Sequence, residues 1–306
     1  MATTLEQTGR WAKAFVNFAQ LNVGVQNEPS LTSANTILQT ITGPPFIWPW
    51  NRNKFAFLIS SGVQDYAQTI SDFGFMEAAS VQPAATITQV ARNASFLMTF
   101  TAANGFSAGD LVTVTGSAVD GGSFNVTNVV IVSVTTTQFT VQGTSGNVVA
   151  IVSDVGTAVS GNAFALEIKA EALTEAVERV RPNWIGTQIN GNSLSFRVVG
   201  IPEQTYQVVV TYQKAPTMFT ALTNSWPIPD KVQYIYNYGF LYMMLDFYDD
   251  ARAGRYRQMF IATLLGAQSG LSEQDKKIFL GSYLPFARAT QAAGQQQSQG
   301  VQARGV

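Results

Sequence analysis

The stretch Trp184-Ile-Gly-Thr-Gln-Ile-Asn-Gly-Asn-Ser-Leu-Ser-Phe-Arg197 contains the clearest fold signal in the chain. Its Asn190-Gly191 pair lies between two apolar runs, which is typical of a tight β-hairpin turn because both central residues must adopt positive φ. The later run Tyr206-Gln-Val-Val-Val-Thr-Tyr212 is β-branched and aromatic, as strands prefer. These two segments predict strands at residues 193–199 and 207–213. Further strands are expected at residues 55–59, 75–79 and 165–170, and all of them belong to one β domain.

A segment of different composition interrupts this domain. Residues 84–162 are rich in Val, Thr, Ser and Gly, contain no lysine, and have only Arg92, Asp110, Asp120 and Asp154 as charged residues. Short apolar runs alternate with Gly-containing turns, which is typical of a small all-β barrel or sandwich. We expect an inserted domain over residues 84–163, with strands at 96–100, 111–115, 129–134, 139–141 and 148–152.

Helices are expected on both sides of the β domain. Near-helical spacing of apolar residues predicts one helix over residues 4–22. A second is expected from an N-cap at Ser30 to Ile41, stopped by Gly43-Pro44-Pro45.

The C-terminal part, from about residue 228 to 289, has the pattern of three helices. Pro229 and Asp230 suit a first helical turn, and a broad apolar stripe follows, from Val232 to Phe247. Gly239 would allow another helix to approach closely, at a cost of about 1 kcal/mol in helix propensity. The second helix is expected to end near Gly266, and Ser272 is expected to cap a third helix that ends near residue 285.

The expected fold class is therefore α+β. A helical bundle, made of the N-terminal helices and three C-terminal helices, accompanies a β-sandwich or β-barrel domain and an inserted small all-β domain. The expected organisation is a core of residues 1–83 and 164–290, the inserted domain at 84–163, and a flexible C-terminal arm at 291–306, which is rich in Gln, Ala, Gly and Ser.

Composition restricts the functions that are open to the chain. It has no Cys and no His, so thiolate and imidazole chemistry, disulfides and Cys or His metal sites are excluded. A net charge of −1 argues against a protein that grips nucleic acid by neutralising phosphates. Charged residues make up 12% of the chain, about half the usual ~25%. Either partners cover much of the surface, or the surface is rich in Ser, Thr, Asn and Gln. No signal peptide, membrane span, metal or cofactor is expected.

No specific catalytic constellation is present. Glu171, Glu175 and Glu178 would share a helix face, but a solvated face paired with Lys169 and Arg179 explains them better. Asp249 and Asp250 precede arginines at a helix corner, which explains them without a bound cation. The enzyme alternative is a glycosidase that uses a pair of carboxylates, for which three residues in or beside strands are candidates. These residues are Glu77, Glu167 and Glu203.

Several stretches form a recognisable pattern of order and spacing. They are Val180-Arg-Pro-Asn-Trp-Ile185, Leu194-Ser-Phe-Arg197, Ile201-Pro-Glu-Gln-Thr-Tyr206, Val210-Thr-Tyr-Gln-Lys-Ala-Pro216 and Trp226-Pro-Ile-Pro-Asp230, followed by the helices to Leu284, with the early region from Asn35 to Trp48. This pattern resembles a family of tailed-bacteriophage virion proteins, the head-to-tail connectors, also called adaptor or head-completion proteins. The resemblance covers about residues 30–83 and 164–285, and the segment from Phe106 to Val141 resembles small β modules of phage structural proteins.

This resemblance implies a non-enzymatic ring, commonly of twelve copies, at the neck of the virion. One face would dock on the portal protein and the other would receive a tail nozzle or tail tube protein. Genomic DNA would pass through the channel without specific binding. The alternatives are another tail component, such as a tail tube, nozzle or baseplate protein, and a receptor- or glycan-binding module formed by the inserted segment.

Candidate interface residues combine aromatic and arginine side chains, which are enriched in interface hot spots. The two tryptophans near residue 50 have two open explanations, because they could fill the edge of a core or anchor a neighbouring subunit. The C-terminal helices and the arm are the expected portal-side contacts. The candidates are Trp48, Trp50, Arg52, Tyr236, Arg252, Arg255, Arg257, Gln291, Gln295 and Arg304.

Overall fold

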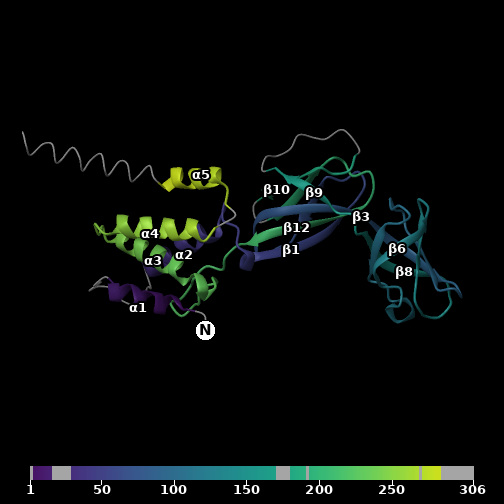
Figure 1. Ribbon diagram of the computed structural model, residues 1–306, viewed down its shortest axis with the longest axis horizontal. Coiled ribbons are helices and arrows are strands. Elements are labelled where there is room, and N and C mark those ends of the chain that lie inside the picture. The colour runs from purple at the N-terminus through teal and green to yellow at the C-terminus, as the bar shows by residue number, and fades with distance from the viewer. Residues whose placement is uncertain (1–2, 16–28, 170–179, 191–192, 269–270, 284–306) are drawn as a thin grey trace, which may run out of the picture. The chain divides into compact units, whose positions relative to one another are not determined.

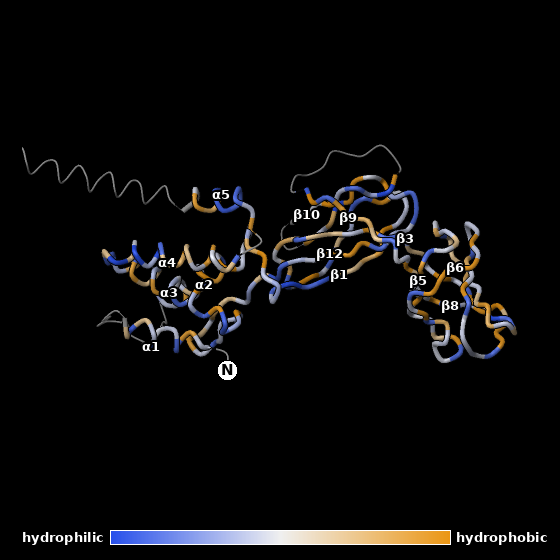
Figure 2. Tube along the Cα trace, in the orientation of Figure 1, coloured by the Kyte–Doolittle hydropathy of each residue, from blue (hydrophilic) through white to orange (hydrophobic). Residues whose placement is uncertain are grey.

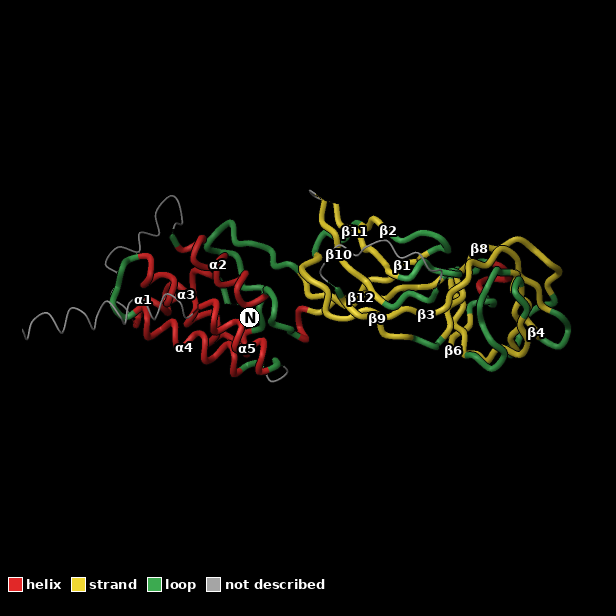
Figure 3. Tube along the Cα trace, turned by 90° about the horizontal axis from the view of Figure 1, so that it is seen from above, coloured by secondary structure: helices red, strands yellow, loops and turns green. Residues whose placement is uncertain are grey.

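The computed structural model describes residues 3–15, 29–169, 180–190, 193–268 and 271–283 (Figure 1). These residues form five α-helices and twelve strands, so the α+β class is confirmed. The chain divides into two compact units. The helical unit comprises residues 1–52 and 213–306, and the β unit comprises residues 53–212. Figure 3 shows the helices in red and the strands in yellow.

The helical unit contains all five helices. The helix expected over residues 4–22 begins at Leu5, and residues 16–22 lie outside the described part of the chain. The expected N-cap is corrected from Ser30 to Pro29. Ser30 is the first helical residue, and no side-chain bond caps this helix. The helices are α1 (Leu5–Phe15), α2 (Ser30–Thr42), α3 (Gln233–Phe247), α4 (Ala253–Gly266) and α5 (Glu273–Tyr283).

The centre of the helical unit is the close contact around Gly239 of α3. A Cβ atom at this position would lie 2.8 Å from Ile37 Cγ2 of α2 and 2.9 Å from Phe260 Cε2 of α4. Real Cβ contacts are essentially never this short, so glycine is what lets these helices meet. The expected close approach of another helix at Gly239 is confirmed.

The ends of the C-terminal helices follow the sequence signals closely. Asp230 opens a short 3-10 turn that runs directly into α3. The second helix ends at Gly266 as expected. Ser272 caps α5, because its Oγ accepts a hydrogen bond from the backbone N–H of Asp275.

The β unit contains a hairpin where the Asn-Gly signal predicts one. β10 and β11 pair antiparallel, with Asn190 opposite Ser193 and Trp184 opposite Val199. The four-residue strand β2 was not predicted, because Asp65-Tyr-Ala-Gln68 has no apolar alternation. The strands are β1 (Arg52–Ile59), β2 (Asp65–Gln68), β3 (Phe73–Arg92), β4 (Leu97–Thr101), β5 (Leu111–Thr115), β6 (Val126–Val134), β7 (Gln138–Gln142), β8 (Val149–Ser160), β9 (Phe164–Ile168), β10 (Trp184–Asn190), β11 (Ser193–Val199) and β12 (Tyr206–Lys214).

The strand expected at residues 75–79 is much longer in the structure. β3 spans 20 residues and continues through Pro83, where the composition changes. Proline lacks an N–H and is normally excluded from the middle of a sheet. Here β3 pairs with β9 up to Val81 and with β8 from Ala84 onward, so Pro83 falls between two pairing partners. The proline therefore interrupts neither ladder.

The strands from Ala84 onward close on themselves. The pairing order β3-β4-β7-β6-β5-β8 returns to β3, which makes a closed six-stranded barrel. Inward-facing apolar residues fill the barrel, and Phe100 stacks on Phe139 with ring centroids 4.9 Å apart. Figure 2 shows orange, hydrophobic stretches on these strands. Closure removes most of the free strand edges that an open sheet would present.

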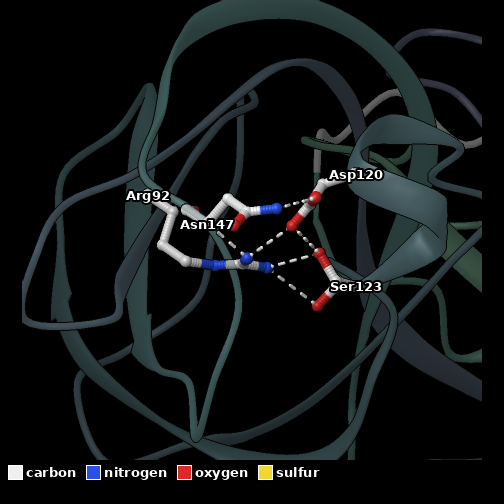
Figure 4. Close-up of polar contacts among 4 residues, drawn as sticks. All are labelled: Arg92, Asp120, Ser123 and Asn147. Atoms are coloured by element: carbon white, nitrogen blue, oxygen red, sulfur yellow. Dashed lines mark hydrogen bonds and ion pairs between the residues drawn. The ribbon is translucent and has the colours of Figure 1, made fainter.

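A buried arginine joins the end of β3 to two loops of the barrel (Figure 4). The side chain of Arg92 is fully buried, and its Nη1 lies 2.8 Å from Asp120 Oδ2. Its Nη2 donates to Ser123 Oγ at 2.7 Å, and its guanidinium lies 4.4 Å from the centroid of the Phe124 ring. Hydrogen bonds from Ser123, Asn147 and Arg92 lower the pKa of Asp120 to about 2, so its carboxylate stays ionised and paired.

Candidate assembly surface

Two of the candidate interface residues lie inside the core of their own subunit. Trp48 is 4% exposed and Tyr236 is fully buried. The indole Nε1 of Trp48 donates to the carbonyl oxygen of Ile41 at 2.6 Å, and Trp226 stacks on Tyr236 at 4.5 Å. These contacts favour core packing as the role of Trp48. Trp50 is partly buried and packs against the same core.

The corner between α3 and α4 contains a paired aspartate and arginine. Asp249 adopts a φ of 52°, which turns the chain sharply after α3. Asp250 accepts two hydrogen bonds from the guanidinium of Arg252, from Nε at 2.9 Å and from Nη2 at 2.6 Å. This fork holds the pKa of Asp250 at about 2. The pair fixes the arginine at the corner, as the Asp-Asp-Arg pattern indicates.

Two aromatic side chains extend this corner into solvent. Phe247 is 62% exposed, and Tyr248 beside it is 39% exposed. Their rings meet edge to face at 5.2 Å. Arg252, the N-cap of α4, and Arg255, in the first turn of α4, are also exposed. We call Phe247, Tyr248, Arg252 and Arg255 the corner patch. Exposed aromatic and arginine side chains have the composition of an interface hot spot.

The remaining candidate interface residues lie in three different parts of the chain. Arg257 is on α4 with Arg255, and its guanidinium lies 5.9 Å from the ring centroid of Tyr242. Arg52 is exposed at the start of β1, far along the chain from the corner. Gln291, Gln295 and Arg304 lie outside the described residues.

Phe247 is a surface residue that the sequence pattern did not identify. The pattern assigns Phe247 to the buried stripe of α3. This helix is apolar on all of its faces, so the sequence does not show which residues lie outside the stripe. Its position directly before Tyr248-Asp-Asp250, where the helix ends, is the signal that could have indicated exposure.

Two of the three carboxylates of the glycosidase alternative, Glu77 and Glu167, lie on opposite faces of the sheet. Ala79 on β3 lies opposite Leu166 on β9. Side chains alternate along a strand, so Glu77 shares the face of these two residues and Glu167 points to the other face. Glu203 instead accepts a hydrogen bond from the Tyr206 hydroxyl at 2.9 Å. Within the described ranges, no three acidic residues gather in a way that could hold a metal ion.

No helix in the described part of the chain is long and apolar enough to cross a membrane.

The fold defines the structural class, an α+β protein, and the corner patch is an exposed aromatic and arginine surface on its helical unit. A family model described as SU10 adaptor protein matches residues 112–278, which is more than half of the 306 residues. The chain therefore belongs to the SU10 adaptor protein family, and the expected membership in the phage head-to-tail adaptors is confirmed. The match overlaps the expected range 164–285 and also includes part of the segment 84–163. A comparison with curated proteins finds no match.

Proposed function

We propose that the chain forms the adaptor ring between the portal and the tail of a tailed phage, with twelve copies surrounding a channel for DNA. The observation that carries this proposal is membership in the adaptor family, joined to an exposed aromatic and arginine surface on the helical unit. In this proposal the corner patch docks on the portal protein, and the opposite face of the ring receives a tail nozzle or tail tube protein.

The charge of the chain suits passage of DNA rather than its capture. A net charge of −1 supplies no excess of cations to neutralise phosphates, and each such contact would hold the DNA more tightly. A channel protein must release DNA as the genome leaves the head. The proposed role is therefore structural and not enzymatic, and its place is the neck of the virion.

The proposed organisation keeps three parts. Residues 1–83 and 164–290 form the adaptor core, residues 84–163 form an inserted all-β domain, and residues 291–306 form a C-terminal arm. The six-stranded barrel and its own apolar core support the second part.

Portal binding tests the proposal through the corner patch. The variant Phe247→Asp/Arg252→Glu replaces an exposed ring and reverses a charge on the patch. We expect it to lower the affinity for isolated portal rings by at least about 100-fold, because hot-spot residues contribute roughly 2 kcal/mol or more each. Sedimentation of the full chain with portal rings measures this loss.

The control for this experiment is Lys54→Glu, which reverses one charge at an exposed position of β1 in the β unit. It should bind portal rings as the unaltered chain does. Unchanged binding by the corner variant would remove the patch from the portal interface. Failure of the unaltered chain to bind portal rings at all would contradict the adaptor function itself.

A further inference from the structure

Three loops lie together at one end of the six-stranded barrel. β3 enters the barrel at Ala84 and β8 leaves it at Ser160, and the loops lie at the opposite end of these strands, where β3 stops and β8 begins. β4 runs antiparallel to β7, and β5 runs antiparallel to β8, so all three loops reach the same end. We call these loops the rim. They join β3 to β4, β5 to β6 and β7 to β8, and comprise residues 93–96, 116–125 and 143–148.

Hydrogen bonds around the buried Arg92 hold the rim together (Figure 4). Arg92 directly precedes the first loop, and its Nη1 donates to Asp120 Oδ2 of the second loop at 2.8 Å. The same nitrogen donates to the carbonyl oxygen of Asn147 in the third loop at 3.4 Å. Within the second loop, Asn125 Oδ1 accepts from the backbone N–H of Ser117 at 3.0 Å. A site built from loops that are already ordered loses little conformational entropy when a ligand binds.

Phe96, in the first loop of the rim, adopts a backbone conformation that costs energy. Its φ is 61°, in the left-handed region that bulky side chains rarely occupy. Two hydrogen bonds hold it there. Its N–H donates to the carbonyl oxygen of Asn93 at 3.1 Å, and its own carbonyl oxygen accepts from the N–H of Gly143 at 2.9 Å. Phe96 is nevertheless 40% exposed. Strain of this kind gathers at functional sites, and here it keeps an aromatic side chain at the surface of the rim.

The side chains around Phe96 are uncharged hydroxyls and amides. Asp120 is the one charged residue in the sequence of the three loops, and its carboxylate is paired with Arg92. Hydroxyl and amide groups both donate and accept hydrogen bonds, as the hydroxyl groups of a sugar do. The exposed polar residues of the first and third loops are Asn93, Ser95, Thr144, Ser145 and Asn147.

We propose that the rim binds a neutral saccharide. The face of the Phe96 ring packs against the C–H groups of one sugar ring, because the negative face of an aromatic ring attracts their partial positive charge. Val148, which is 68% exposed in the third loop, adds an apolar contact. The hydroxyl and amide side chains of the loops bind the sugar hydroxyls. This inference goes beyond the adaptor function and does not depend on it, since the rim belongs to the barrel alone.

The chemistry of the rim favours a neutral saccharide over other classes of partner. Protein interfaces are usually anchored by several aromatic and arginine side chains, whereas Phe96 is the exposed aromatic residue of the rim and Arg92 is buried. A nucleic acid or an acidic sugar needs cations. Residues 84–162 contain no lysine, and Arg92 is already paired with Asp120. One stacking ring with uncharged hydrogen-bonding groups is what a neutral sugar requires.

Glycan binding by the full-length chain tests this proposal. The protein is applied to a printed array of bacterial surface glycans that includes neutral and anionic members, and we expect retention on neutral ones. Interferometry with a retained neutral glycan then compares variants. Phe96→Asn removes the ring, while asparagine tolerates the positive φ, so the loop keeps its shape. We expect its affinity to fall by at least about 10-fold, because the stacking contact is lost. Phe96→Tyr keeps the ring and should bind as the unaltered chain does.

Leu111→Asn is the matched control. Leu111 is 45% exposed at the start of β5, at the other end of the barrel, so this variant should bind normally. Thr144→Ala/Ser145→Ala removes two exposed hydroxyls and leaves the ring in place. It should also lower the affinity, which tests the rim independently of Phe96. Retention on anionic glycans alone, or on no glycan of the array, would overturn the proposal. Unchanged affinity of both rim variants would do the same. Each of these results leaves the adaptor function standing, because portal binding is measured separately.

Discussion

Replacement of Gly239 by valine should destabilise the helical unit by roughly 2–3 kcal/mol, the usual cost of overpacking a tightly filled core. The new Cβ would lie 2.8 Å from Ile37 Cγ2 and 2.9 Å from Phe260 Cε2, so α2 or α4 must move away from α3. Valine has a slightly higher helix propensity than glycine, and this gain offsets only a few tenths of a kcal/mol of the cost. Thermal unfolding should show a midpoint lowered by roughly 4–12 °C.

Gly254→Val is the matched control for this prediction. Gly254 lies in the first turn of α4, and nothing surrounds the position of its Cβ within 4 Å. Valine there should leave the unfolding midpoint unchanged or raise it slightly. Equal midpoints for the two valine variants would show that the helices do not meet at Gly239.

Replacement of Arg92 by methionine should be the second large effect, a loss on the order of 3 kcal/mol in the stability of the β unit. The arginine side chain is fully buried, so methionine keeps much of its volume but loses the bonds to Asp120 and Ser123. The contact with the Phe124 ring also loses its cation. Denaturant unfolding, followed by far-ultraviolet circular dichroism, measures the change.

Two variants separate the network from charge alone. Lys54→Met removes one positive charge from an exposed position of the same unit, and it should change stability by less than about 0.5 kcal/mol. Arg92→Lys keeps the charge but cannot reproduce the fork to Asp120 and Ser123, so its stability should fall between those of the other two. A stable Arg92→Met protein would show that packing alone holds the barrel.

The elements with local signals could be predicted from the sequence. The hairpin at residues 190–193 follows from its Asn-Gly turn, and the strand at residues 111–115 from its alternation between two glycine turns. The close helix contact follows from Gly239 in an otherwise apolar helix. Each of these signals lies within a few residues of the structure that it specifies.

Features that depend on distant partners could not be predicted. Pro83 indicates the end of a strand, but β3 continues because its partner changes from β9 to β8 at that point. Phe247 has the spacing of a core residue, and its exposure depends on which helices lie beside α3. The sequence leaves Trp48 open between core and interface, because the choice depends on the contact with Ile41 and on the helices that pack around it.

Location of the chain within the whole phage particle tests the adaptor assignment most directly. Cryo-electron microscopy of the particle should show a ring of this chain between the portal and the tail, with the helical unit against the portal. Density for this chain along the tail tube, or at the baseplate, would contradict the adaptor account.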